Sequence, residues 1–223
     1  MTSWSPRALP DGRVVIVAPH PDDEVIGCGG LLWWCAAERR PATIVAVTDG
    51  EASHARSMLI TPAELRLRRV TERAEALRHL GASATTIVRL GAPDGACREH
   101  VASIADRLHE MLRPGDVVVG PSNEDRHSDH VAVSDALRAA AGGLVDHVWE
   151  APTWALVHGT APAPDRRLTL GANAWRAKRR AFAAHRSQVV PIGPAIEDGP
   201  VVHPAEVARM IRPVEGFRAV AVA

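Results

Sequence analysis

Four short and largely apolar runs of residues constrain the fold of this chain more than any other feature. They lie at residues 14–18, 42–48, 85–90 and 116–120. Segments of helical length, including residues 102–112 and 129–141, alternate with them. This alternation is typical of a parallel sheet with helices on both faces. The sequence therefore predicts an α/β fold with a doubly wound, mainly parallel sheet.

One helix has both of its ends marked in the sequence. Thr61 is a typical N-cap residue, Pro62 suits the first helical position, and Glu64 stands where a capping box places an acid. Gly81 then provides a stop signal. We therefore expect a helix between these two ends.

The alternation of strands and helices weakens beyond residue 145. We expect strands within residues 147–159 and 166–171, and helices within residues 172–188 and 203–211. Nothing between these segments resembles a long flexible linker, so we expect a single domain over residues 1–223. Its core would be residues 14–145, and residues 146–223 would form a C-terminal extension of short strands and helices that completes the site.

The charge balance argues against two classes of partner. The chain carries 26 Lys and Arg against 26 Asp and Glu, which gives a formal net charge of +0. This balance provides no electrostatic footprint for nucleic acid or for an anionic membrane, and it favours a small-molecule partner. The N-terminal residues lack the pattern of a signal peptide, and no apolar run approaches the length of a membrane span. We therefore expect a cytoplasmic protein without membrane insertion, and a homo-oligomer is compatible with this sequence.

Polar residues follow each of the four apolar runs. The segments are HPDDE at 20–24, DGE at 49–51, APDG at 92–95 and SNEDRHSDH at 122–130. In open α/β sheets, ligands bind beyond the carboxyl ends of the strands. PDG and TDG taken singly are ordinary turn sequences. Four polar loops at one edge nevertheless predict a functional site there.

A divalent cation would explain the crowding of acids in HPDDE. His20 and Asp23 stand three residues apart in a loop stiffened by Pro21, and His130 follows the fourth apolar run. Two imidazoles and one carboxylate with open coordination positions are typical of a catalytic zinc or ferrous site. The sequence thus predicts a metal site built from two distant motifs.

Each motif also has a simpler interpretation. HPDDE could be an acidic cluster that the macrodipole of the following helix favours. HSDH could belong to a helix capped by Asp125 or Ser128, with His127 and His130 exposed on its first turn. We favour the metal hypothesis because three adjacent acids exceed what a cap needs and because the two motifs would meet across the fold.

Several other kinds of site are excluded by spacing. GCGG at residues 27–30 does not have the G-x-G-x-x-G spacing of a dinucleotide site, and the acids before it would repel a pyrophosphate. The chain has no Walker A motif and no G-x-S-x-G nucleophile motif. Cys28, Cys35 and Cys97 show no C-x-x-C pairing, which predicts buried, reduced thiols.

Taken in order, the motifs resemble the LmbE-like (PIG-L) family of zinc-dependent N-deacetylases. The matching segments are APHPDDEVIGCGG, TDGE, RVTERAEALRHLG, PDG, HSDH and KRRAFAAHRSQ, and they span roughly residues 14–190. The combination of HPDDE with a distant H-x-D-H is the specific part. The resemblance implies a Rossmann-like fold and hydrolysis of an N-acyl group, typically acetyl on a glucosamine-type sugar.

The resemblance also implies roles for individual residues. The family's zinc ligands fall on His20, Asp23 and His130. Its general base falls on Asp22, and His127 takes the place of the histidine that stabilises the tetrahedral intermediate. Asp129 takes the place of the partner of that histidine and would favour a protonated imidazole. Either Asp22 or His127 would return a proton to the leaving amine.

The chain departs from the family pattern in two respects. Ser128 stands where the family commonly has proline, and the chain contains no tyrosine. Three further residues match the pattern near its end, namely Lys178, His185 and Gln188. We expect Glu24 to orient a metal ligand or to cap the following helix.

The expected substrate-binding residues are Arg69, Asp94 and Arg56. Arg56 lies in residues 51–60, a segment with the length of a lid. Arg69 shares a helix with Glu72, and the alternative for these two is an exposed helix pair. Tryptophans 149, 154 and 175 are candidates for stacking on a sugar, although burial in a core is their commoner position.

The leading hypothesis is a zinc-dependent enzyme that removes the N-acetyl group from an N-acetylglucosamine-type sugar or glycoside. Fe²⁺ or another divalent metal is an alternative to zinc. A second hypothesis is an amidase that acts on a larger N-acyl group or on a thiol conjugate. A third is a sugar- or nucleotide-binding α/β module without catalysis, in which the acids hold a structural ion.

Overall fold

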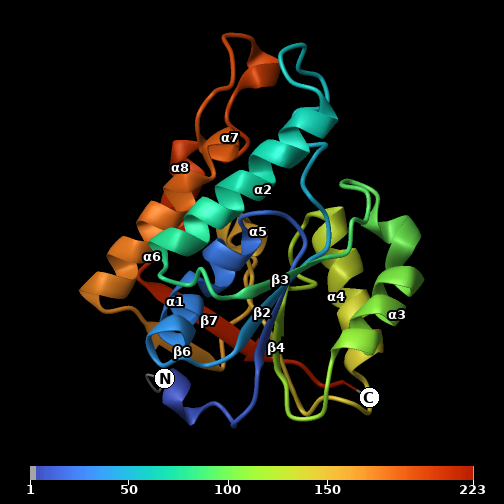
Figure 1. Ribbon diagram of the computed structural model, residues 1–223, viewed down its shortest axis with the longest axis vertical. Helices are drawn as coiled ribbons and strands as arrows, with labels where there is room; N and C mark the ends of the chain where they lie inside the picture. The colour runs from blue at the N-terminus through green and yellow to red at the C-terminus, as the bar shows by residue number, and fades with distance from the viewer. Residues whose placement is uncertain (1–3, 223) are drawn as a thin grey trace.

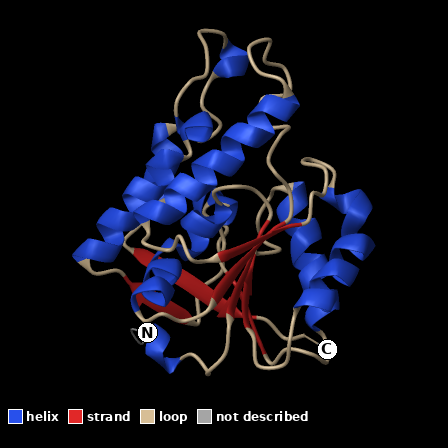
Figure 2. Cartoon of the chain, viewed as in Figure 1, coloured by secondary structure: helices blue, strands red, loops and turns tan. Residues whose placement is uncertain are grey.

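The computed structural model describes residues 4–222, which form an α/β fold around a seven-stranded sheet (Figures 1 and 2). The strand order is β3-β2-β1-β4-β5-β7-β6. Five strands are parallel, namely β1 (Val14–Ala18), β2 (Ala42–Ala46), β3 (Thr86–Arg89), β4 (Val117–Gly120) and β5 (His147–Glu150). Two are added antiparallel, namely β7 (Val214–Ala219) and β6 (Arg166–Thr169). The predicted mainly parallel sheet is confirmed.

Helices cover both faces of this sheet, as Figure 1 shows. One layer contains α1 (Asp23–Ala37), α2 (Pro62–His79) and α6 (Ala172–Ala184), and the other contains α3 (Val101–Met111) and α4 (Ser128–Ala141). Strand β1 shows why the apolar runs are continuous. Val14 and Ile16 pack in the core under the first layer, whereas Val15 and Val17 pack in the core under the second. Every position of a strand covered on both faces must therefore be apolar.

Short helical segments connect the larger elements. They are η1 (Pro6–Ala8), η2 (Cys97–His100), α5 (Trp154–His158), α7 (Arg186–Val189), η3 (Ile196–Asp198) and α8 (Pro204–Met210). At the top of Figure 1 the loop that follows β2 and the loop that contains η3 stand side by side. Ser57 donates a hydrogen bond to Asp198 at 2.6 Å across them, and the backbone oxygen of Gly199 lies 3.2 Å from a ring nitrogen of His54.

The predicted ends of α2 are confirmed in detail. The Thr61 side chain accepts a hydrogen bond from the Glu64 backbone N–H at 3.2 Å, and the Glu64 carboxylate accepts one from the Thr61 backbone N–H at 2.8 Å. At the other end Gly81 has a φ of 68°, a left-handed conformation that glycine adopts without strain.

Three features of the C-terminal part differ from the sequence prediction. Only His147–Glu150 of residues 147–159 form a strand, and Trp154–His158 is a helix. The helix predicted over residues 172–188 is interrupted at His185, which lies between α6 and α7. Strand β7 was not predicted, because its sequence VEGFRA combines an acid, a glycine and an arginine and so lacks the apolar run of the other strands.

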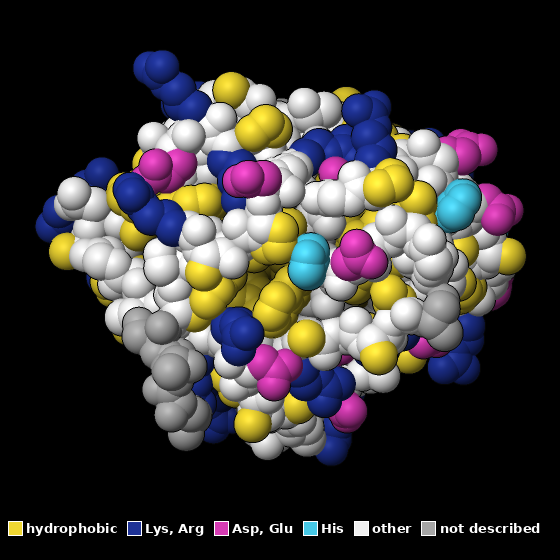
Figure 3. Space-filling view, turned by 90° about the horizontal axis from the view of Figure 1, so that it is seen from below, with side chains coloured by type: hydrophobic (Ala, Val, Ile, Leu, Met, Phe, Trp, Pro, Cys, Tyr) yellow, Lys and Arg dark blue, Asp and Glu magenta, His cyan; other side chains and the backbone are white. Residues whose placement is uncertain are grey.

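The surface has charges of both signs (Figure 3), as the balanced net charge predicts, and the cysteines are buried, as their spacing predicts. On the face seen from below, Lys and Arg side chains are interspersed with Asp and Glu, and hydrophobic side chains gather in a central hollow (Figure 3). All three cysteines are buried and free. Within the described part of the chain, no helix has the length and apolar character needed to cross a membrane.

A buried ion pair joins the C-terminal part to helix α1. Lys178 of α6 and Glu215 of β7 are both 1 % exposed at their side chains, and Nζ lies 2.6 Å from Oε1. Lys178 also donates to the backbone oxygen of Ile26, while Glu215 accepts from the backbone N–H of Gly30 at 2.6 Å. A Cβ at Gly30 would clash with the end of the Leu170 side chain and lie 3.1 Å from the Glu215 carboxylate, so a larger residue would displace one of these side chains. Lys178, which matched the family pattern, thus ties three elements together.

Lys178→Met tests this ion pair, because it leaves the Glu215 carboxylate buried without its cation. We expect the free energy of unfolding, measured by urea denaturation, to fall by about 3 kcal/mol or more. The double variant Lys178→Met/Glu215→Gln removes both charges and should recover part of that loss. A double variant as unstable as the single variant would show that the charge is not the cause.

Candidate functional site

The four polar loops meet at the carboxyl edge of the parallel strands. They surround a cavity of about 280 Å³. The residues that line it from these loops are His20, Asp22, Asp23, Ala52, Ser53, Asp94, Gly95 and His127. Helix α1 adds Ile26, helix α2 adds Arg69, and the C-terminal part adds Trp154, Gln188, Val201 and Val202. The cavity therefore collects residues from most of the chain.

Three side-chain atoms converge at the wall of this cavity. Nδ1 of His20 lies 3.3 Å from Oδ2 of Asp23 and 3.3 Å from Nε2 of His130. The third side of the triangle, from His130 Nε2 to Asp23 Oδ2, is 3.2 Å. The structure thus brings together the two motifs that lie 110 residues apart in the sequence.

Carboxylates fix the orientation of both imidazoles. Asp125 lies 2.8 Å from Nδ1 of His130. Asp129 and Asp94 lie 3.2 Å and 3.1 Å from Nε2 of His20. A carboxylate at one ring nitrogen holds the proton there, so the other ring nitrogen presents its lone pair to the triangle.

Without a metal ion, protonation of His20 and His130 compensates the negative charge of the nearby carboxylates. Burial lowers the pKa of His130, but the charge of Asp23 and the hydrogen bond to Asp125 outweigh burial and raise it to about 9. Burial likewise acts on His20, whose pKa is nevertheless raised by its hydrogen bonds to Asp129 and Asp23. Positive charge is therefore favoured at this point, and metal binding at such a site displaces protons.

The spacing of the three atoms fits a divalent cation. Tetrahedral zinc binds nitrogen and oxygen ligands at about 2.0–2.1 Å, which places neighbouring ligand atoms about 3.3 Å apart. The observed sides of 3.2–3.3 Å match this value. His20 also belongs to two other groups with metal-binding composition, one with His127 and His130 and one with Asp94 and Asp129. In the triangle with Asp23 all three sides measure 3.2–3.3 Å, and carboxylates fix the orientation of both imidazole rings.

Asp22 lies next to the triangle without being part of it. It is the N-cap residue of α1 and has a φ of 134°, a strained value for a residue other than glycine. Burial raises the pKa of its carboxyl to about 7, although the charge of Arg69, whose Nη2 lies 3.6 Å away, acts in the opposite direction. A carboxylate with a pKa near neutrality is suited to general base catalysis.

Arg69 and Glu72 are buried, so they do not form an exposed helix pair. Arg69 donates hydrogen bonds to the backbone oxygens of Pro21 and Gly50, at 2.7 Å and 2.9 Å. A Cβ at Gly50 would clash with the Arg69 guanidinium. Arg69 thus lines the cavity and also joins the loops that follow β1 and β2.

His127 differs from the expectation of a protonated imidazole. Its Nδ1 accepts a hydrogen bond from the backbone N–H of Asp129 at 3.2 Å, which leaves Nε2 as the donor of the neutral ring. Burial and the charges of His20 and His130 lower its pKa to about 4. The carboxylate of Asp129 is directed to His20 and to two backbone N–H groups instead of to the His127 ring.

The two other expected substrate-binding residues lie in different surroundings. Asp94 lines the cavity and accepts a hydrogen bond from the Ala52 backbone N–H at 2.8 Å. Arg56 is exposed and is absent from the cavity lining. Trp154 lines the cavity, whereas the rings of Trp149 and Trp175 lie under Arg166 and Arg179.

Asp125, expected only as a helix cap, has a different role in the structure. His127 is the N-cap residue of α4, and Asp125 instead accepts from Ala155 N–H at 2.7 Å besides contacting His130. His130 is 0 % exposed, which contradicts the alternative of an exposed first turn. The spacing of five residues from Asp125 to His130 carried no helical signal that could have revealed the contact.

Glu24 and His185 are buried beside the cavity-lining residues and do not line the cavity themselves. Glu24 is 0 % exposed, and its carboxylate receives the Nε–H of Arg73 at 2.9 Å and the backbone N–H of Asp22 at 3.2 Å. His185 is also fully buried, and neither of its ring nitrogens has a hydrogen-bond partner among the described residues. Burial lowers the pKa of His185 to about 4.

The sequence of this chain is similar to those of known deacetylases. The profile of the PIG-L family, described as GlcNAc-PI de-N-acetylase, matches residues 15–141, which is more than half of the chain. A 2'-N-acetylparomamine deacetylase of Streptomyces fradiae is 32% identical over 154 residues, which cover 59% of this chain and 53% of that protein. The chain thus spans about half the length of this curated relative.

Two solved structures have the same fold. The conserved protein TT1542 of Thermus thermophilus is 28% identical, with a TM-score of 0.66 and coverage of 96% of both chains. The N,N'-diacetylchitobiose deacetylase of Pyrococcus horikoshii is 21% identical, with a TM-score of 0.67 and coverage of 93% of this chain and 83% of the other.

His185 should make stability depend on pH. Its folded pKa of about 4 lies below the ordinary value of 6.5, so the unfolded chain binds the proton more readily. The folded protein is therefore not penalised by His185 above pH 6.5, where this side chain is neutral in both states. As the pH falls toward 4, protonation of the unfolded chain lowers the free energy of unfolding. In His185→Leu, the free energy of unfolding should fall less between pH 6.5 and 4.5 than in the wild type, by about 2 kcal/mol. Urea titrations at several pH values measure this difference, and parallel pH profiles would contradict it.

Proposed function

The chain belongs to the PIG-L family of GlcNAc-PI de-N-acetylases, and from this premise we propose that it removes the N-acetyl group from an N-acetylglucosamine-type sugar or glycoside. The products would be acetate and a free amine. One observation carries the proposal: three converging metal-ligand atoms and a separate carboxylate, Asp22, share one open cavity. The amino-sugar deacetylase from Streptomyces fradiae supports the same class of substrate.

The proposed cofactor is Zn²⁺, with Fe²⁺ or another divalent metal as an alternative. His20, Asp23 and His130 would hold it, and their mutual spacing supports this assignment. When bound, such a cation lowers the pKa of water and polarises the amide carbonyl. Asp125, Asp94 and Asp129 would keep the two imidazoles in the tautomer that this role requires.

The proposed general base is Asp22. Its carboxylate would take the proton from the attacking water, and its raised pKa of about 7 supports this role. The charge of Arg69 stabilises the ionised form of Asp22, so the carboxylate can remain charged although it is buried. The proton must then reach the leaving amine, either from Asp22 itself or from His127.

His127 would stabilise the oxyanion as a neutral hydrogen-bond donor. Its Nδ1 accepts from the Asp129 backbone, so Nε2–H is the group that would donate to the substrate. The ring lines the cavity and lies with its centroid 4.7 Å from that of His20. Because the chain has no tyrosine, His127 is the side-chain donor that we assign to the developing charge.

The substrate would be bound in the cavity beside the metal ligands. We propose that Asp94 contacts a sugar hydroxyl and that Trp154 packs against a sugar face, because both line the cavity. Arg69 would act by orienting the loops and Asp22, and Arg56 would contact only parts of a substrate that extend beyond the cavity. Residues 146–223 would complete the site within a single domain, since Trp154, Gln188 and Val202 belong to the lining.

Two alternatives differ in what the protein would release. An amidase for larger N-acyl groups would prefer an N-octanoyl sugar over its N-acetyl counterpart, whereas a binding module would release nothing. A panel of N-acetylglucosaminides with matched N-octanoyl compounds, assayed for free acid and free amine, separates all three functions. We expect acetate from at least one N-acetyl compound and a requirement for stoichiometric metal.

Two substitutions separate metal binding from proton transfer. His130→Ala should lose the metal, because it removes one corner of the triangle, and elemental analysis of the purified protein measures the metal content. Asp22→Asn should keep the metal and lose about 10²-fold or more of kcat. His79→Ala, which changes an exposed histidine, is the matched control. It should keep the full metal content and the full kcat. A His130→Ala protein with full metal content would overturn the ligand assignment, and an active Asp22→Asn protein would place the base elsewhere.

The dependence of activity on pH distinguishes a neutral from a protonated His127. Deprotonation of Asp22 should make kcat/KM rise with pH, with a midpoint below about 7 once a cation lies nearby. His127, with a pKa lowered to about 4, is already neutral in this range. His127→Ala should therefore reduce kcat/KM without changing any decrease at alkaline pH. An alkaline decrease that disappears in His127→Ala would show that the protonated ring is the active form.

A further inference from the structure

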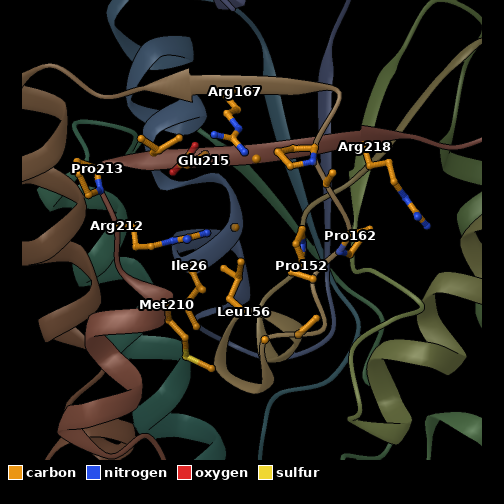
Figure 4. Close-up of a pocket in the computed structure, with 18 residues that line it drawn as sticks. Ile26, Pro152, Leu156, Pro162, Arg167, Met210, Arg212, Pro213, Glu215 and Arg218 are labelled. Atoms are coloured by element: carbon orange, nitrogen blue, oxygen red, sulfur yellow. The ribbon is translucent and has the colours of Figure 1, made fainter. Parts of the chain in front are cut away.

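A second cavity, of about 500 Å³, lies beside the catalytic one and has no part in the proposed reaction. Helix α1, helix α5 with the loop after it, and strand β7 form its walls (Figure 4). Ile26 lines both cavities, so this side chain forms part of the partition between them. The volume lies within the range of about 300–1,000 Å³ typical of small-molecule sites.

One part of this cavity is apolar. Ile26 and Met210 are 4% and 2% exposed, and Leu156 faces them in Figure 4. Pro152 and Pro162 continue this wall with rings that donate no hydrogen bond. An occupant of this part would have to present a hydrocarbon surface, because it finds no polar partner in these side chains.

The opposite part of the cavity has an excess of positive charge. Arg167 and Arg212 both line this part; Figure 4 shows Arg212 extending into the space between β7 and Ile26, and Arg167 extending from β6 toward β7. Neither guanidinium has an acidic partner within the part of the chain that the structure describes. Two uncompensated cations therefore stand over an apolar surface.

The other charged residues of the lining are already neutralised. Arg218 extends away from the other two arginines in Figure 4, and its Nε lies 2.6 Å from Glu150. The carboxylate of Glu215 is paired with Lys178 at 2.6 Å. The charge available to a ligand is therefore that of Arg167 and Arg212 alone.

We propose that this cavity binds a small amphipathic anion, a molecule with a hydrocarbon body and one acidic group. The body would lie against Ile26, Leu156 and Met210, and the carboxylate, phosphate or sulfate group would be held by Arg167 and Arg212. Arginine suits this role because its planar N–H groups match the oxygens of such anions. The site is distinct from the proposed catalytic centre, and its existence does not depend on the proposed reaction.

Calorimetric titration of the purified protein with octanoate and with octanamide tests this proposal. The two probes share one chain length and differ in charge. We expect octanoate to bind at least about tenfold more tightly, with a preference that shrinks as salt is added. The titration is repeated after removal of metal by a chelator, and the affinity for octanoate should not change. Equal affinity for the two probes, or loss of octanoate binding with the metal, would overturn the proposal.

Variants locate the binding. Arg167→Met and Arg212→Met should each weaken octanoate by about tenfold and leave octanamide unchanged. Arg166→Met is the matched control, since Arg166 neighbours Arg167 on β6 but lies over the Trp149 ring. Leu156→Trp should fill the cavity and weaken both probes. Unchanged octanoate affinity in both arginine variants, or in Leu156→Trp, would exclude this cavity as the binding site.

Discussion

The ion pair between Lys178 and Glu215 fixes the helix that brings Asp22 and Asp23 into the site. Helix α1 carries Asp22 at its N-cap and Asp23 in its first turn, and the ion pair holds the same helix at Ile26 and Gly30. A buried ion pair is costly unless its remaining donors and acceptors are satisfied. Here the backbone of α1 satisfies them, so the cost of burial is offset by contacts that also set the position of the helix.

Three consecutive acids enter three different surroundings at the start of α1, where Asp22 has a non-helical backbone and Asp23 and Glu24 lie in the first turn. Asp22 faces the open cavity, Asp23 faces the two imidazoles, and Glu24 turns back toward Arg73. Burial raises the pKa of Asp22. Burial acts in the same direction on Asp23, but the charges and hydrogen bonds of His130 and His20 together outweigh it and lower the pKa of Asp23. The crowding of acids in the sequence is therefore resolved by the different surroundings of the three side chains as well as by the positive charge that His20 and His130 favour at this point.

Much of this arrangement was predictable from local sequence patterns. The four apolar runs, the capped helix α2 and the gathering of polar loops at one edge each follow from periodicity or from turn and cap chemistry. The contacts of Asp129 were not predictable in this way. Its position suggested a partner for His127, but the loop after β3 brings Gly95 and Cys97 to its carboxylate and directs it to His20. Such a choice between two nearby imidazoles depends on tertiary packing, which no local pattern encodes. The same holds for Glu215, which contacts a helix 185 residues away.

The place of β7 in the sheet has a consequence for how the chain acquires its structure. This strand follows all the other described elements in the chain, yet it lies between β5 and β6 in the sheet. During synthesis β6 leaves the ribosome with no strand beside it, and Glu215 is still missing when α1 and α6 are complete. Domains fold as their chains emerge, and long-range pairings form late. Strand β6 can therefore join the sheet only through β7, and helix α1 gains its contact with Glu215 when β7 pairs with β5.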